Sequence, residues 1–172
     1  MIDKLLLPWA LRYMRRSPDV VIQNATGPYL ERWYVLPRSA RRTDQNDSSY
    51  RTVTGNLIGF YIHRFLQSDE EHAPHDHPRH NASLVLDRGY WEHIKGRRVW
   101  RPPGSIVIRR ASTPHRIELE TSSGLPRYNQ EAISLFITGP RIREWGFHCP
   151  KGWVMWKDFY AKTPRGGENG CS

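Results

Sequence analysis

Cysteine is scarce in this chain, where only Cys149 and Cys171 occur among 172 residues. Small secreted proteins that depend on disulfides carry many more cysteines, so the sequence gives no sign of a disulfide framework. A long apolar run is also lacking. The stretch from Leu5 to Leu11 is far shorter than the roughly 20 residues that span a bilayer, and no small-residue cleavage site follows it. We therefore expect a cytoplasmic protein with free thiols and no membrane span.

Several common catalytic motifs are missing as well. The chain has no glycine-rich phosphate loop, no His-Glu-x-x-His helix and no Gly-x-Ser-x-Gly elbow. Their absence argues against the common nucleotide hydrolases, metalloproteases and α/β-hydrolases. Acidic residues are few, with 17 Asp and Glu against 26 Lys and Arg, and the net charge is +9. This surplus favours anionic partners such as nucleic acid or phosphorylated metabolites without choosing among them.

Short strand-like segments fill most of the chain. They are rich in β-branched and aromatic residues, and turn-forming Gly and Pro separate them. The expected strands are Tyr29–Leu36, Leu57–Phe65, Ser83–Leu86, Tyr90–Ile94, Arg98–Trp100, Ser105–Arg109, Arg116–Leu119 and Ala132–Thr138. Frequent short strands without intervening helices indicate an all-β antiparallel sandwich or barrel.

One barrel domain is expected to occupy residues 29–160. Residues 1–28 are expected to form an N-terminal helix and an arm, and residues 161–172 a flexible tail that lacks apolar anchors. The polar stretches 37–52 and 121–130 are expected to be loops within the barrel.

The two ends of the chain are expected to pack against this barrel. A helix from Lys4 to Arg16 would cap its outside, with Leu5, Trp9 and Met14 near its buried stripe. Residues 145–159 would wrap back against it, anchored by Trp145, Trp153 and Trp156.

A histidine cluster is the main candidate for chemistry, because five of the eight histidines fall between His63 and His80. Side chains at positions i and i+2 of a strand share one face, so His75 and His77 can direct two imidazoles at one cation. A third histidine, His115, starts a later strand. The alternative interpretation is a solvated, histidine-rich loop.

Two sequence patterns resemble the motifs of the cupin superfamily. They are the His75-x-His77 pair with the following Gly89, and the Pro-x-Gly-type turn at Gly104 with the later Pro-His115. A closer resemblance is to small cupin-like proteins of phages and prophages. It covers most of the chain, in Tyr29-Leu-Glu-Arg-Trp-Tyr-Val-Leu-Pro-Arg38, Ile62-His-Arg-Phe-Leu-Gln-Ser-Asp69, His75-Asp-His-Pro78 and Trp145-Gly-Phe-His-Cys-Pro-Lys-Gly-Trp153.

The resemblance implies a cupin-type double-stranded β-barrel (jelly roll) with a short N-terminal helix and a metal site at His75, His77 and His115. The family's first motif commonly carries a glutamate after its second histidine, where this chain has Asn81 and Ala82. The implied site is therefore a three-histidine centre like that of cysteine-dioxygenase-type cupins, with open positions for substrate and oxygen. The expected cofactor is one divalent transition metal, with iron favoured over zinc, nickel or manganese.

Four further residues are candidates for the pocket. His63 and His148 are the candidate catalytic residues, although a barrel-lining structural histidine is the alternative for His63. Tyr61 and Arg116 are the candidates for substrate binding, with Arg116 assigned to an anionic group. His93, beside Glu92, is expected on the strand surface.

The favoured function is an iron-dependent oxygenase-type enzyme that acts on a small or nucleotide-like, anionic substrate. The small phage and prophage proteins that the chain resembles have no settled activity, so two alternatives stay open. One is a non-catalytic cupin that binds a small ligand, and the other is a phage-associated module that modifies DNA or nucleotides. Nucleic acid is the less favoured partner, and it depends on a basic stripe formed by Arg97, Arg98, Arg101, Arg109 and Arg110 near Trp91 and Trp100. The oligomeric state is left open, a homodimer included.

Overall fold

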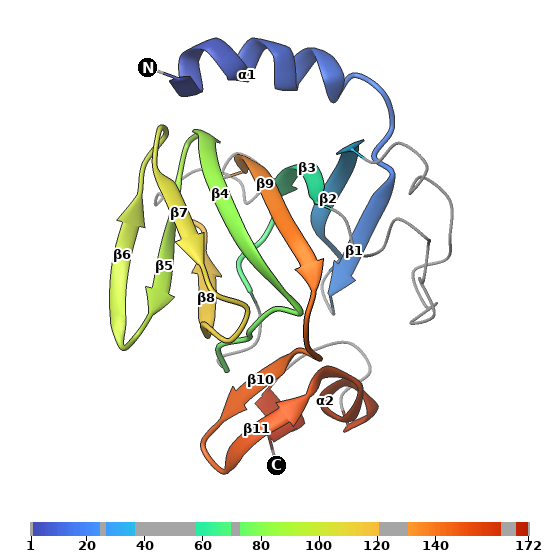
Figure 1. The fold of residues 1–172 in the computed structure, drawn as a ribbon, viewed down its shortest axis with the longest axis vertical. Helices are drawn as coiled ribbons and strands as arrows, with labels where there is room; N and C mark the ends of the chain where they lie inside the picture. Colours follow the sequence, from blue (N-terminus) through green and yellow to red (C-terminus); the bar gives the residue numbers. More distant parts are fainter. Residues whose placement is uncertain are drawn as a thin grey trace.

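The computed structural model describes residues 2–24, 27–36, 58–69, 73–120, 131–162 and 168–171 (Figure 1). The expected loops at 37–52 and 121–130 lie outside these residues. In chain order the elements are α1 (Ile2–Tyr13), β1 (Val20–Asn24), β2 (Gly27–Leu36), β3 (Gly59–Phe65), β4 (Arg79–Asp87), β5 (Tyr90–Ile94), β6 (Arg97–Arg101), β7 (Ile106–Arg109), β8 (His115–Glu118), β9 (Ala132–Arg141), β10 (Gly146–Cys149), β11 (Gly152–Met155), α2 (Trp156–Lys162) and the 3₁₀ helix η3 (Glu168–Cys171).

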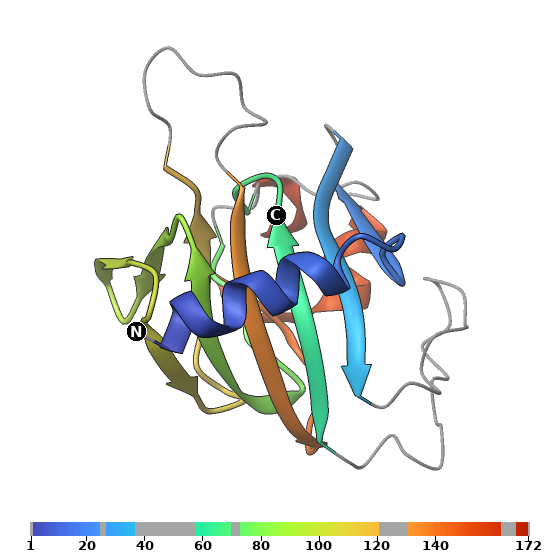
Figure 2. The same cartoon turned by 90° about the horizontal axis from the view of Figure 1, so that it is seen from above.

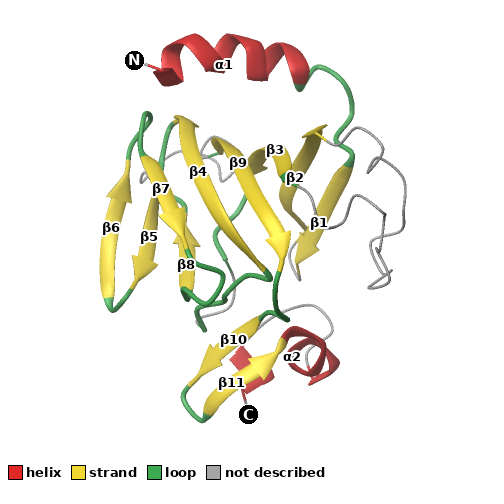
Figure 3. Cartoon of the chain, in the orientation of Figure 1, coloured by secondary structure: helices red, strands yellow, loops and turns green. Residues whose placement is uncertain are grey.

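Two antiparallel sheets form the body of the molecule. The large sheet has six strands in the order β1-β2-β3-β9-β4-β7, and the small sheet has three in the order β6-β5-β8. The chain crosses from one sheet to the other between β4 and β5, where Arg88 and Gly89 both have positive φ (60° and 94°). The prediction of an all-β double-sheet fold with a short N-terminal helix is confirmed (Figure 3).

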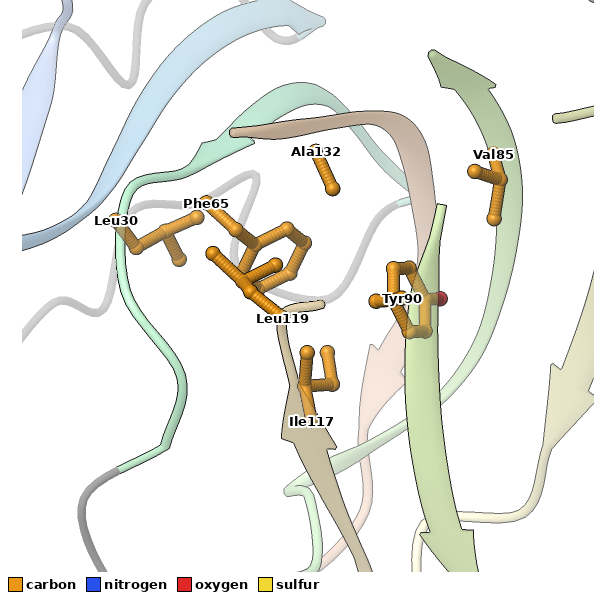
Figure 4. Close-up of a cluster of buried hydrophobic side chains, with 7 residues drawn as sticks. All are labelled: Leu30, Phe65, Val85, Tyr90, Ile117, Leu119 and Ala132. Carbon is orange, nitrogen blue, oxygen red and sulfur yellow. The ribbon is translucent and has the colours of Figure 1, made fainter. Parts of the chain in front are cut away.

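A hydrophobic core joins the two sheets. Figure 4 shows its side chains, which come from strands of both sheets and from the segment after β8: Leu30, Phe65, Val85, Tyr90, Ile117, Leu119 and Ala132. All are buried. Burial of a large apolar side chain contributes about 1.5–3 kcal/mol, so this cluster fixes the spacing of the two sheets.

The helix α1 lies across the outer face of the large sheet (Figure 2). Its packed side is formed by Leu6, Ala10 and Met14, which recur at the four-residue spacing of a helix face. The buried side of the helix is rotated by part of a turn from the predicted stripe, because Leu5 is 75% exposed and Trp9 is 39% exposed. The helix therefore leaves the inner face of the sheet free for a site.

The strand β1 was not predicted, and it lies within the segment expected to be an arm. It pairs with β2, with Val21 opposite Glu31, and forms an edge of the large sheet. The run Val20-Val21-Ile22 was the available signal, since β-branched residues favour strands.

Residues 145–159 pack as a separate layer below the barrel (Figure 1), with two of the three predicted anchors against its buried cluster. The buried rings are Phe147 and Phe159, whose centroids are 3.8 Å apart. Trp145 and Trp156 pack at the edge of this cluster, whereas Trp153 is 42% exposed.

The expectation of free thiols is wrong. Cys149 and Cys171 form a disulfide, with their Cα atoms 5.3 Å apart. It ties η3 to β10, so the predicted flexible tail is anchored at Glu168–Cys171, while residues 163–167 lie outside the description. Among the described residues, no helix has the length and apolar character needed to cross a bilayer.

Candidate metal centre

Three histidines meet on the inner side of the barrel. His75 and His77 lie in the segment before β4, and His115 is the first residue of β8. Their candidate ligand nitrogens all lie within 4.8 Å of one another, and Nε2 of His77 is 2.8 Å from Nε2 of His115. The structure thus brings together the three residues that the resemblance implied as metal ligands.

Backbone hydrogen bonds hold this arrangement. The His75 amide donates to the His115 carbonyl oxygen, and the His115 amide donates to the His75 carbonyl oxygen, each at a distance of 3.0 Å. His75 also forms an isolated bridge with Phe147 on β10. Two ligands far apart in the sequence are therefore placed by a local antiparallel pairing.

Asp76 lies between two of the ligands and points to the opposite side of the segment. Its buried carboxylate accepts hydrogen bonds from the Gly146 amide (2.9 Å), Arg143 (2.5 Å), the Trp153 indole (3.0 Å) and His148 (3.0 Å). Alternation of side chains explains this geometry, because neighbours of an inward residue point outward. Asp76 fastens the ligand-bearing segment to the β10–β11 hairpin, a role that sequence reasoning missed.

His148 is not where sequence reasoning placed it. Its ring binds Asp76 behind the ligand segment and does not line the cavity. The assignment of His148 as a catalytic residue is therefore not supported by its position.

Glu92 is a second residue that sequence reasoning missed. Its carboxylate is fully buried, with Oε1 3.1 Å from Nδ1 of His115 and 2.6 Å from Nε of Arg109, and Oε2 2.8 Å from Nε of Arg101. Burial by itself would raise the pKa of Glu92, but His115 and Arg109 outweigh it and lower the pKa to about 2. The alternation along β5, where Tyr90 and Glu92 are both inward, was the available signal.

Two of the three ligand imidazoles, those of His77 and His115, are held in their neutral form. Burial lowers the pKa of His77 well below its usual value, and the neighbouring His115 adds to the effect. Burial also lowers the pKa of His115 to about 4, against the opposing effect of Glu92. Neutral imidazole is the form that binds metals, and a set of three histidine donors suits a divalent transition metal.

The histidines open into a cavity of about 410 Å³, a size that accommodates a small molecule. Its wall combines aromatic rings with polar groups. The polar and charged lining residues are Gln23, Tyr29, Arg32, Tyr61, His63, Asp69, Arg79, Asn81, Ser83, Arg109, Thr138 and Tyr160, besides the three histidines.

His63 and Tyr61 both line this cavity, as expected for pocket residues. The His63 ring accepts a hydrogen bond from Nε of Arg32 (2.9 Å) and stacks on Phe136, with centroids 4.7 Å apart. Burial, with the nearby Arg32 charge, lowers the pKa of His63 well below its usual value. His63 is therefore a neutral imidazole in the cavity wall.

Arg116 does not face the cavity. It follows the inward His115 on β8, and its Nη2 lies 3.0 Å from Nε2 of His93 and 3.7 Å from Glu118. Arg116 therefore lies with His93 on the outer side of the small sheet.

Two arginines of the predicted basic stripe form ion pairs with the buried Glu92 instead, namely Arg101 and Arg109, and Arg109 is only 2% exposed. The arginines that line the cavity are Arg32, Arg79 and Arg109. No sequence pattern separated these three from the surface arginines.

Comparison with known proteins finds similarity at the level of the fold. No family model matches the chain, and no curated protein matches it. Similar solved structures include the DMSP lyase DddQ from Ruegeria pomeroyi DSS-3, with 16% identity over 56% of this chain and 46% of that chain (TM-score 0.41). Others are Fe(II) HppE, with 11% identity over 69% and 54% (TM-score 0.48), and a putative mannose-6-phosphate isomerase from Ralstonia eutropha JMP134, with 12% identity over 73% and 97% (TM-score 0.46). The chain spans about half the length of the first two.

The architecture agrees with the fold that the resemblance implies. Two facing antiparallel sheets enclose a core, and three histidines converge on the inner side of the fold. The expected double-sheet fold and the convergence of the three histidines are confirmed.

Proposed function

We propose that this chain is a metal-dependent cupin enzyme that binds one divalent transition metal at His75, His77 and His115 and, with iron, carries out oxygen-dependent chemistry on a small substrate. One observation carries this proposal: three imidazoles, two of them held neutral, converge on the wall of a 410 Å³ cavity. No carboxylate joins the three histidines within the described residues.

The donor set favours an oxygenase over a hydrolase. Ferrous iron held by three neutral ligands would keep its double charge and leave positions open for a substrate and dioxygen. Phe136, Trp145 and Phe147 form an apolar wall beside the histidines. His63 offers a neutral imidazole and Tyr61 a hydroxyl to a substrate in the same cavity.

Metal content tests the first half of the proposal. Wild-type protein loaded with ferrous iron under anaerobic conditions should carry about one metal per chain, and the double variant His75→Ala, His77→Ala should lose it. The variant His93→Gln is the matched control, because His93 lies beside Glu118 and away from the cavity. Equal metal content in wild type and the double variant would refute the assignment.

Oxygen consumption tests the second half. The iron-loaded wild type should consume oxygen with at least one member of a panel of thiols, keto acids and modified nucleotides. Stabilisation by a panel member without oxygen consumption would instead favour a cupin that binds a small ligand. Salt-dependent binding of nucleic acid would favour the DNA- or nucleotide-modifying alternative.

A further inference from the structure

A row of polar side chains crosses the inner face of the large sheet beside the three histidines. In the strand register, Asn81 on β4 lies opposite Arg109 on β7 and opposite Thr138 on β9. All three residues are buried and line the cavity. Because neighbouring strands are about 4.8 Å apart, the row extends across about 10 Å of the cavity wall.

Two atoms in this row have no hydrogen-bond partner. Arg109 donates through Nε to Glu92 (2.6 Å) and through Nη1 to Ser83 (3.0 Å), but its buried Nη2 is unpaired. The buried Oγ1 of Thr138 is also unpaired. Buried polar groups are nearly always paired, and leaving one unpaired costs about 1–3 kcal/mol. Two such atoms in one cavity wall indicate a group that pairs with them when the cavity is filled.

The charge of the cavity indicates what that group is. Arg32 and Arg79 line the cavity together with Arg109, whereas Asp69 is the only carboxylate in its described lining. Asp69 is already occupied, because it accepts hydrogen bonds from the Tyr29 hydroxyl and the Ile117 amide. The cavity therefore favours an anion, and a guanidinium beside a hydroxyl suits a carboxylate.

The row is also adjacent to the metal ligands. Nε of Arg109 and Nδ1 of His115 both contact the same oxygen of Glu92. Arg109 and the three histidines also line the same cavity, so a carboxylate held by Arg109 would share that cavity with the three-histidine centre.

We propose that Arg109 and Thr138 form an acid-binding subsite that holds one carboxylate of a short organic acid, whose other end reaches the three-histidine centre. The claim that the acid reaches the three-histidine centre rests on the proposed function, whereas the claim that Arg109 and Thr138 hold its carboxylate rests only on the polar row.

Malonate, succinate and glutarate are suitable probes, with succinamide as the uncharged control. Thermal stability and calorimetric titration should show that at least one diacid binds the wild type and that succinamide does not. Thr138→Val, which keeps the side-chain shape but removes the hydroxyl, should weaken diacid binding roughly tenfold through the lost hydrogen bond to a charged group. The ligand-free variant should be at least as stable as wild type, because an unpaired buried hydroxyl is gone.

Two further variants separate the subsite from a general effect on the fold. Arg109→Lys keeps the charge but loses the forked donor, so it should weaken binding at least as much as Thr138→Val. Ser134→Ala lies on the same strand as Thr138 but outside the cavity lining, and it should bind the diacids as wild type does.

The experiment is done with both chelator-treated and metal-loaded protein, with metal content measured on each sample. Diacid binding by metal-free wild type, lost in Thr138→Val, would support the subsite even where the metal proposal fails. Binding of no diacid, or equal binding by wild type, Thr138→Val and Arg109→Lys, would overturn the subsite while leaving the metal result unaffected.

Discussion

The buried carboxylate of Glu92 lies 3.1 Å from Nδ1 of His115, on the side of the ring away from the other histidines. A ligand histidine is commonly oriented by a carboxylate at its second nitrogen, which fixes the tautomer and makes the ring a better donor. The same carboxylate holds Arg109 and Arg101, so one anion connects the metal ligand to the cavity wall.

Replacement of Glu92 by Gln should therefore weaken metal binding. A loss of roughly 10 to 100-fold in affinity is expected when such an orienting partner is removed. Competition with a chelator of known affinity measures it. Glu118→Gln is the matched control, because Glu118 lies on the adjacent strand but binds Arg98 and His93, and its metal affinity should equal that of wild type.

Asp76 should be important for stability as well as for the metal. Its substitution by Ala would leave the buried Gly146 amide unpaired and remove the ion pair with the partly exposed Arg143, and an unsatisfied buried group costs about 1–3 kcal/mol. Urea unfolding at pH 7 measures this change, and metal affinity should fall in the same variant because Asp76 fixes the segment that carries His75 and His77.

His148→Ala provides the comparison for Asp76. The His148 side chain is 37% exposed and makes one of the four hydrogen bonds to Asp76, so its loss should cost about 1 kcal/mol or less. Metal binding and any turnover should be retained. A variant that keeps its metal but loses turnover would restore His148 as a catalytic candidate.

The residue pattern was sufficient for the fold class and for two of the three converging histidines. Short strands rich in β-branched and aromatic residues, with turn residues between them, indicate an antiparallel sandwich or barrel, and the His-x-His spacing places two imidazoles on one face. The third histidine followed from the resemblance, because nothing in the local pattern around His115 shows which distant strand it meets.

The residues that complete the site could not be predicted in the same way. Arg109 and Arg116 are both strand arginines, and only the pairing of β7 with β4 turns the first inward. The surface position of His93 was predicted, but nothing in the sequence indicated that its buried neighbour Glu92 contacts His115 and Arg109. A one-residue change of register exchanges the two faces of a strand, so composition alone does not identify the inward residue.

Stability should fall as the pH is lowered below about 6.5 in chelator-treated protein. The pKa of His63, of His77 and of His115 is lower in the folded chain than in the unfolded chain, so protonation favours unfolding. Their contribution is fully present above the unfolded pKa and is lost toward the folded values, about 4 for His115.

Urea unfolding between pH 7.5 and pH 4.5 isolates this effect. The pKa values of Glu92 and Glu118 are both lowered to about 2. The stability that these two groups contribute is therefore lost only below about pH 4.5, which is outside that range. His63→Gln should make the decline shallower, because it removes one of the buried imidazoles. An unchanged slope would show that His63 does not contribute.

Gly59 at the start of β3 should be required for the shape of the cavity. A Cβ at this position would overlap the Tyr61 hydroxyl and lie 2.7 Å from Oγ1 of Thr138. Gly59→Ala should therefore displace the Tyr61 ring and cost about 1–3 kcal/mol, the usual range for overpacking. Gly139→Ala is the matched control, because the nearest heavy atom to its Cβ is 3.8 Å away, and it should be close to neutral.

A double-variant cycle identifies the cause of the loss at Gly59. Tyr61→Leu shortens the side chain that the new Cβ would meet, so Gly59→Ala should cost less in that background than in wild type. Because the overlap involves two cavity-lining groups, Gly59→Ala should also weaken diacid binding, whereas Gly139→Ala should not. Equal costs of Gly59→Ala in both backgrounds would mean that the glycine is needed for a reason other than the position of Tyr61.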